Sequence, residues 1–180
     1  MEIKPSNLIA TELFGVDPGK SNGGIAKFSD RIESWPMPED FDRIREYWDY
    51  QKEICKRPLV ILEKVDMWGS DTPEKRFGIK KMLDHYAELR SIIRTRDFPF
   101  IEVASISWQS YLKIRIGKED KLIRKRRYKD IATELYPSQK VTLKTCDALL
   151  LVEFGRRKLQ YEPLWIMQHV QNEKKAQTIF

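Results

Sequence analysis

The sequence predicts a mixed α/β domain in which helices cover a single sheet. Short apolar runs alternate with turn residues up to residue 37, as in antiparallel strands. From residue 39 onward, stretches with apolar residues at helical spacing alternate with further apolar runs. This order of elements is typical of a mixed sheet with helices packed on it. The 180 residues are enough for one such domain with a full core.

Three short strands joined by tight turns are expected near the N-terminus. Pro18-Gly19 ends the first strand, and Asn22-Gly23-Gly24 supplies the turn before the second. Ser29-Asp30 supplies the turn before the third. The strands themselves are expected at residues 13–16, 25–28 and 31–37.

The rest of the chain predicts helices around two further strands. Apolar residues recur at helical spacing in residues 39–55, and Pro58 ends that segment. The all-apolar run 59–62 is typical of a central strand buried on both faces. A polar loop at 66–75 precedes a long amphipathic helix at 77–96. The remaining elements are a fifth strand at 100–104 and helices at 107–114, 121–136 and 144–159.

The composition indicates a soluble protein of the cell interior. Hydrophobic residues make up 41% of the chain and charged residues 33%, as in globular proteins with a highly charged surface. No apolar stretch approaches the roughly 20 residues of a transmembrane helix, and the N-terminus lacks the pattern of a secretory signal. Cys55 and Cys146 are too few and too far apart for a zinc site. We therefore expect no membrane partner and a reducing compartment.

Positive charge is concentrated in one segment. The net charge is +6, and nine of the 17 residues from Lys113 to Lys129 are lysine or arginine. Such a cluster indicates a polyanionic partner, for example nucleic acid. The alternative is a solvated helix face with no partner, and charge alone does not separate the two.

Three carboxylates lie in or beside apolar runs. Asp17 follows Leu-Phe-Gly-Val, Glu63 interrupts a run that begins at residue 59, and Asp147 opens Asp-Ala-Leu-Leu-Leu-Val. An ionised carboxylate is costly to bury unless a cation compensates it, and a divalent metal bound by oxygen ligands does so. If the strands ending at Asp17 and Glu63 are neighbours, both acids emerge at one sheet edge, and Asp147 can reach them from the last long helix.

Each acid also has an alternative interpretation. Asp17 can belong to a surface turn, Glu63 can pair with a basic helix, and Asp147 can cap a helix that begins at Ala148. A converged cluster of three, in contrast, suits two Mg²⁺ ions about 4 Å apart that hydrolyse a phosphodiester.

The motifs together resemble the RuvC-type Holliday junction resolvases of the ribonuclease H-like superfamily, in particular their small phage branch. The similarity covers residues 11–158 and rests on the order and spacing of its motifs. These are Gly-Val-Asp-Pro-Gly at 15–19, Gly23-Gly24, Leu-Glu-Lys-Val at 62–65, Phe77-Gly78, Ile-Ser-Trp-Gln at 106–109, Leu-Tyr-Pro at 135–137, Asp-Ala-Leu-Leu-Leu at 147–151 and Gly-Arg-Arg at 155–157. It implies a ribonuclease H-like domain at 1–160, with a five-stranded mixed sheet, and a tail at 161–180 that packs on the domain or on a partner subunit.

The resemblance implies a homodimeric crossover junction endodeoxyribonuclease that cuts four-way and other branched DNA. In such an enzyme Asp17, Glu63 and Asp147 are both the catalytic and the metal-binding residues, with two Mg²⁺ ions and Mn²⁺ as a substitute. Lysines before the last helix hold the scissile phosphate in this family, and Lys121 and Lys113 match them best. The expected location is the cytoplasm of a bacterium or of a phage-infected cell.

One departure from the family pattern concerns a fourth acid, expected three to five residues before Asp147. Thr142, Leu143 and Lys144 stand there instead. Lys144, one helical turn before Asp147, is therefore a candidate for contacting DNA phosphate.

Two further DNA contacts and two further functions are considered. Arg124 of the basic segment is a candidate DNA-binding residue, and Trp68 either stacks on an unpaired base or anchors its loop. Because the fourth acid is missing, a non-catalytic junction-binding protein is an alternative to the nuclease. A ribonuclease acting on RNA–DNA hybrids is another.

Overall fold

A five-stranded mixed sheet forms the centre of the molecule, which a computed structural model describes at residues 12–65 and 73–170. The sheet order is β3-β2-β1-β4-β5. The first three strands pair antiparallel, whereas β4 pairs parallel with both β1 and β5. The strands are β1 (Glu12–Asp17), β2 (Gly24–Phe28), β3 (Ile32–Pro36), β4 (Pro58–Lys64) and β5 (Phe100–Ala104). The predicted fold class, a mixed sheet of five strands flanked by helices, is confirmed.

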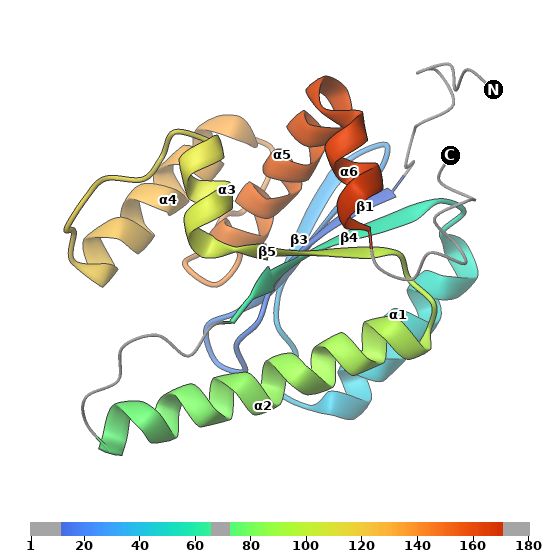
Figure 1. The fold of residues 1–180 in the computed structure, drawn as a ribbon, viewed down its shortest axis with the longest axis horizontal. Helices are drawn as coiled ribbons and strands as arrows, with labels where there is room; N and C mark the ends of the chain where they lie inside the picture. The colour runs from blue at the N-terminus through green and yellow to red at the C-terminus, as the bar shows by residue number, and fades with distance from the viewer. Residues whose placement is uncertain (1–11, 66–72, 171–180) are drawn as a thin grey trace.

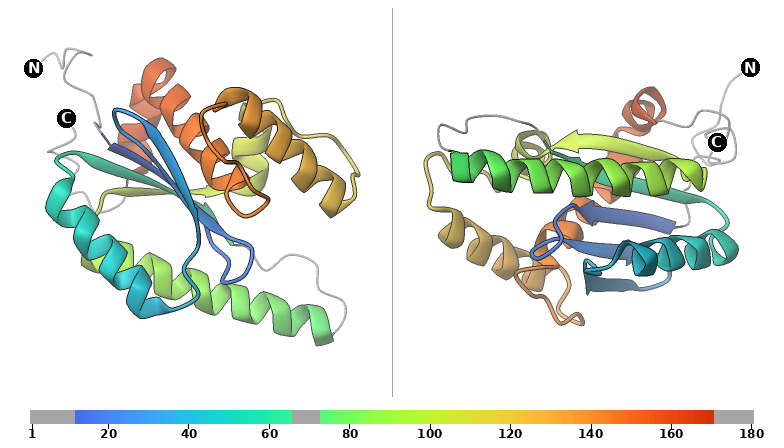
Figure 2. Two further views of the ribbon diagram at one scale, coloured as in Figure 1. Left: turned by 180° about the vertical axis from the view of Figure 1, so that it is seen from behind. Right: turned by 90° about the horizontal axis from the view of Figure 1, so that it is seen from below.

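Helices cover both faces of this sheet (Figures 1 and 2). One face carries α1 (Phe41–Ile54) and α2 (Pro73–Thr95). The other face carries α5, with α3, α4 and α6 around it. The bounds on this side are α3 (Ser105–Tyr111), α4 (Lys121–Leu135), α5 (Cys146–Tyr161) and α6 (Pro163–His169).

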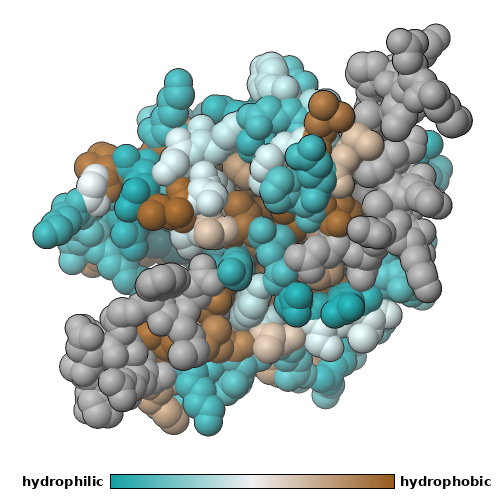
Figure 3. Space-filling model, in the orientation of Figure 1, coloured by the Kyte–Doolittle hydropathy of each residue, from teal (hydrophilic) through white to brown (hydrophobic). Residues whose placement is uncertain are grey.

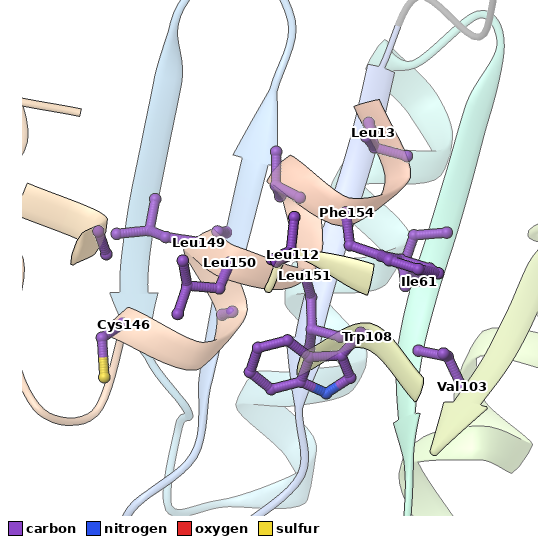
Figure 4. Close-up of a cluster of buried hydrophobic side chains, with 14 of the residues drawn as sticks. Leu13, Ile61, Val103, Trp108, Leu112, Cys146, Leu149, Leu150, Leu151 and Phe154 are labelled. Carbon is purple, nitrogen blue, oxygen red and sulfur yellow. The ribbon is translucent and has the colours of Figure 1, made fainter. Parts of the chain in front are cut away.

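The alternation of side chains along β1 divides the core in two. Phe14 and Val16 are fully buried against α1 and α2, whereas Leu13 packs toward α5. Figure 4 shows the second cluster, in which Leu149 and Leu151 of α5 lie over the sheet near Trp108. By the same alternation, Asp17 shares the α5 face with Leu13. The strand pattern therefore directs Asp17 toward the helix that carries Asp147.

Two glycines allow α5 to lie unusually close to the sheet. A Cβ atom at Gly15 would overlap the carbonyl oxygen of Ala148 and would lie 2.8 Å from the backbone nitrogen of Val152. Two turns further along α5, a Cβ atom at Gly155 would lie 2.8 Å from Ile61 Cγ1. Helix and sheet are thus in direct backbone contact, and this contact sets the height of Asp147 above β1.

The structure differs from the predicted elements at several helix ends: α3 spans Ser105–Tyr111 in place of 107–114, and α5 begins at Cys146 in place of 144. Helix α2 begins at Pro73, within the loop expected at 66–75, and the first position of a helix tolerates proline. The tail contains a short helix, α6, whose Ile166 is fully buried on α5 and β5. The division of the chain at residue 160 stays a prediction, and Trp68 lies outside the described residues. Within those residues no helix is long and apolar enough to span a membrane.

Candidate active site

Asp17, Glu63 and Asp147 come together at one edge of the sheet. Each offers a carboxylate oxygen, and these oxygens all lie within 4.8 Å of one another. Asp17 is the last residue of β1, and Glu63 lies on the parallel strand β4, where Leu62 is the partner of Val16. The two acids therefore emerge side by side at the carboxyl ends of paired strands, as the sequence predicted.

Asp147 reaches this edge from the first turn of α5. The helix begins at Cys146 with Thr145 as its N-cap residue, so Asp147 does not serve as the cap. A turn before the helix, in which the Thr142 carbonyl oxygen accepts hydrogen bonds from the amides of Thr145 and Cys146, fixes this starting point. Lys144 lies in that turn and not on the helix.

The surroundings of Glu63 fit a cation. Ser105 donates a hydrogen bond to Glu63 Oε1, whereas the buried Oε2 makes no hydrogen bond of good geometry among the described residues, although the indole of Trp108 lies near enough to favour the charged form of Glu63. A buried carboxylate oxygen without a partner is costly, and a bound divalent ion would compensate it. Three carboxylates with an unpaired buried oxygen therefore form a suitable set of hard ligands for a divalent metal.

A lysine that the sequence analysis did not single out completes the cluster. Lys125 of α4 places its Nζ 2.5 Å from Asp147 Oδ2 and 3.4 Å from Asp17 Oδ2. The side chain is 22% exposed, so the ion pairs are largely shielded from water. Its position one helical turn after Lys121 in a predicted helix was the available signal, because residues four apart share a face. Of the described lysines, Lys125 is the one that contacts these acids.

Burial and mutual repulsion shift the pKa values of the cluster. Burial, followed by the charges of Glu63 and Asp147, holds the pKa of Asp17 well above its usual range. Burial and the charge of Asp147 raise the pKa of Glu63 to about 7, although its hydrogen bond with Ser105 opposes this. Burial opposes the charged form of Lys125, but Asp17 and Asp147 outweigh it and raise the pKa of Lys125. The metal-free cluster therefore retains protons that a metal would displace.

Glu63 makes the stability of the metal-free protein depend on pH. The pKa of Glu63 rises from 4.5 to about 7 on folding. Its contribution to the free energy of unfolding is therefore fully present below pH 4.5 and is lost as the pH rises through 7. We expect this loss to reach about 3 kcal/mol. Denaturant unfolding in EDTA between pH 5 and 8 measures the free energy of unfolding of the wild-type protein. Glu63→Gln is the reference, because this part of the pH dependence is absent in it. If the free energy of unfolding fell equally with pH in both proteins, Glu63 would not be the group responsible.

The acids lie at the base of a large cleft. It has a volume of 1310 Å³ and runs between the N-terminal half of α2 on one side and α3 and α4 on the other. Three of the predicted DNA contacts line it, namely Lys121, Arg124 and Lys144, whereas Lys113 is exposed outside it. Lys20, Lys81 and Arg115 add positive charge that the sequence analysis did not assign to the site, whereas Asp84, Glu88 and Asp120 are acidic residues of the same walls.

The walls of the cleft carry exposed apolar side chains as well as charges. The helical spacing of apolar residues in 77–96 predicts that Met82 of α2 faces the core, but its side chain is 39% exposed because this half of α2 extends past the sheet (Figure 1). Across the cleft, Ile106 and Leu122 are at least half exposed. Figure 3 shows hydrophobic residues on both sides, over α2 and over α4. A basic cleft with apolar walls suits a nucleic acid, whose bases and phosphates require both kinds of contact.

Comparison with solved structures identifies this architecture. Thermus thermophilus RuvC in complex with a Holliday junction substrate aligns with a TM-score of 0.55 and 12% sequence identity, over 85% of this chain and 97% of the RuvC chain. A second T. thermophilus RuvC structure aligns with a TM-score of 0.51 and 12% identity, over 89% and 98% of the two chains. The chain has the fold of RuvC.

The similarity to RuvC is one of fold. No protein-family model matches the sequence, and no curated protein does. The ribonuclease H-like arrangement that the motifs predicted is confirmed, and it spans nearly the whole of RuvC. Within this fold, the function of the chain depends on the residues that it places at the cleft.

Proposed function

We propose that the chain is a RuvC-type Holliday junction resolvase, a metal-dependent endonuclease that cuts four-way and other branched DNA. The convergence of Asp17, Glu63 and Asp147 carries the proposal, because a cluster of partly buried, mutually repelling acids that lines a cleft is typical of a functional site. The RuvC structure with a Holliday junction substrate supports the substrate class.

The three acids would hold Mg²⁺, two ions in the DNA complex, with Mn²⁺ as a substitute. A metal held by these acids would supply activation of a water molecule and stabilisation of the leaving oxygen of a phosphodiester. Asp17 ends β1, which pairs with the strand of Glu63 and packs against the helix of Asp147, and it contacts Lys125. Ser105 holds one oxygen of Glu63, and the other oxygen is buried. These contacts orient the ligands before DNA binds.

Basic residues along the cleft position the DNA backbone. Lys121 and Arg124 lie on α4 beside the acids, and Lys144 lies on the turn before α5. We assign Lys113 to a DNA contact outside the cleft and Trp68 to stacking on an unpaired base at the junction. A homodimer would cut two opposed strands of a junction. The net charge and the free cysteines Cys55 and Cys146 suit the cytoplasm of a bacterium or a phage-infected cell.

Cleavage of synthetic DNA tests the proposal. The substrates are a four-way junction, a three-way junction, linear duplex DNA and an RNA–DNA hybrid of equal length, each with Mg²⁺, with Mn²⁺ or with EDTA. We expect metal-dependent cleavage of the branched substrates and little cleavage of linear DNA. Salt-sensitive binding without cleavage in either metal would instead identify a junction-binding protein. Preferred cleavage of the hybrid would identify a ribonuclease.

A further inference from the structure

Lys125 occupies a place among the acids that a cation would otherwise take. Its ammonium bridges Asp17 and Asp147, at 3.4 and 2.5 Å. The two carboxylates are themselves 13% and 15% exposed, so the bridge is largely shielded from water although its residues line the cleft. Glu63 is the acid that Lys125 does not pair with, and its Oε2 is the buried oxygen without a partner.

The packing of α4 holds Lys125 in this position. Tyr128 and Ala132 are buried in the contact of α4 with α5, and Lys125 precedes them by three and seven residues, on the same face of the helix. The Cys146 thiol donates to the backbone oxygen of Lys125 at 3.9 Å, beside Asp147. The lysine is therefore part of the packed interface and differs from the exposed lysines at the cleft rim.

Charge balance indicates what this lysine does. Three ionised carboxylates and one ammonium leave two negative charges, which a single divalent ion neutralises. A second divalent ion would have to approach the ammonium or displace it, and like charges at contact distance repel strongly where burial limits screening. The unpaired oxygen of Glu63 marks the side of the cluster that stays available.

We propose that Lys125 takes the place of a second cation, so that the DNA-free protein binds one divalent ion, on the side of Glu63. Lys144, which stands where a fourth acid was expected, is exposed, and the described residues show no contact between its ammonium and the acids. The proposal builds on the acid cluster of the proposed function, but it does not depend on DNA cleavage.

Metal binding without DNA tests the proposal. Titration calorimetry with Mn²⁺, in parallel with electron paramagnetic resonance of free Mn²⁺, gives the stoichiometry and the affinity. We expect one ion per wild-type chain. Lys125→Met should bind a second ion or bind the first about tenfold more tightly. Lys129→Met is the matched control, because it removes a lysine one turn later on α4 that does not line the cleft. Lys125→Arg keeps the charge and should bind one ion.

Thermal unfolding in EDTA supplies a second readout. Without Lys125 the three carboxylates repel one another, so Lys125→Met should unfold at a lower temperature than Lys129→Met. Added Mn²⁺ should raise the unfolding temperature of Lys125→Met by more than that of Lys129→Met. Two ions on the wild-type chain, or unchanged stoichiometry and affinity in Lys125→Met, would overturn the proposal. If the metal data agree but no variant cuts DNA, the proposed function fails and the role of Lys125 stands.

Discussion

Asp17→Asn is expected to reduce cleavage of branched DNA by about 10³-fold or more, because metal coordination supplies several kcal/mol of transition-state stabilisation. Asp17 is the acid at the end of β1 whose pKa responds to both Glu63 and Asp147, so its loss disrupts the whole cluster. Binding of the same DNA should be retained or strengthened, because the change removes a negative charge from a basic cleft. Single-turnover cleavage and gel-shift titration at one salt concentration measure the two quantities.

The control for this variant is Asp130→Asn, which makes the same chemical change at an exposed residue of α4 outside the cleft. It should cut at the wild-type rate. Glu63→Gln should lose cleavage activity as Asp17→Asn does, because it removes a metal ligand but keeps the shape of the side chain. Normal cleavage by either site variant would show that the three acids are not the catalytic centre. Loss of binding in Asp17→Asn would mean that the change had disturbed the fold.

The convergence of two of the acids could be predicted because it follows from strand periodicity. Asp17 and Glu63 each end an apolar run, and the carboxyl ends of paired parallel strands meet at one edge. The position of the third acid, Asp147, depends on where its helix begins. The sequence predicted a start at residue 144, whereas the turn held by Thr142 delays it to Cys146. Because of this two-residue shift, Lys144 precedes the helix and does not share a helix face with Asp147.

Lys125 was harder to predict because its role comes from tertiary packing. Its segment contains nine basic residues, and charge alone does not distinguish one that is buried from one that is solvated. The distinction needs the contact of α4 with α5, which places Tyr128 and Ala132 inside and carries Lys125 with them. The same limit explains Met82. Its helical spacing predicts an inward side chain, but the N-terminal part of α2 extends past the sheet (Figure 1), and Met82 is exposed.

Gly15→Ala is expected to lower the free energy of unfolding by about 3 kcal/mol or more, at the upper end of the range for overpacked cores. The added methyl group would overlap the carbonyl oxygen of Ala148 and lie 3.0 Å from Leu151 Cβ. Backbone atoms cannot rotate away as a flexible side chain can, so α5 must move off β1. Urea unfolding monitored by tryptophan fluorescence measures the loss.

The same displacement should weaken metal binding, because Asp147 lies one residue before Ala148 on the helix that moves. Mn²⁺ affinity of the folded Gly15→Ala protein, measured at low temperature, should therefore fall, although no ligand has been changed. Gly78→Ala is the control: nothing lies within 4 Å of a Cβ atom there, and alanine in a helix should stabilise by up to about 1 kcal/mol. If Gly15→Ala matched wild-type in stability and in Mn²⁺ affinity, contact between α5 and β1 would not be what positions Asp147. A loss of both links the core packing of the sheet directly to the geometry of the acid cluster.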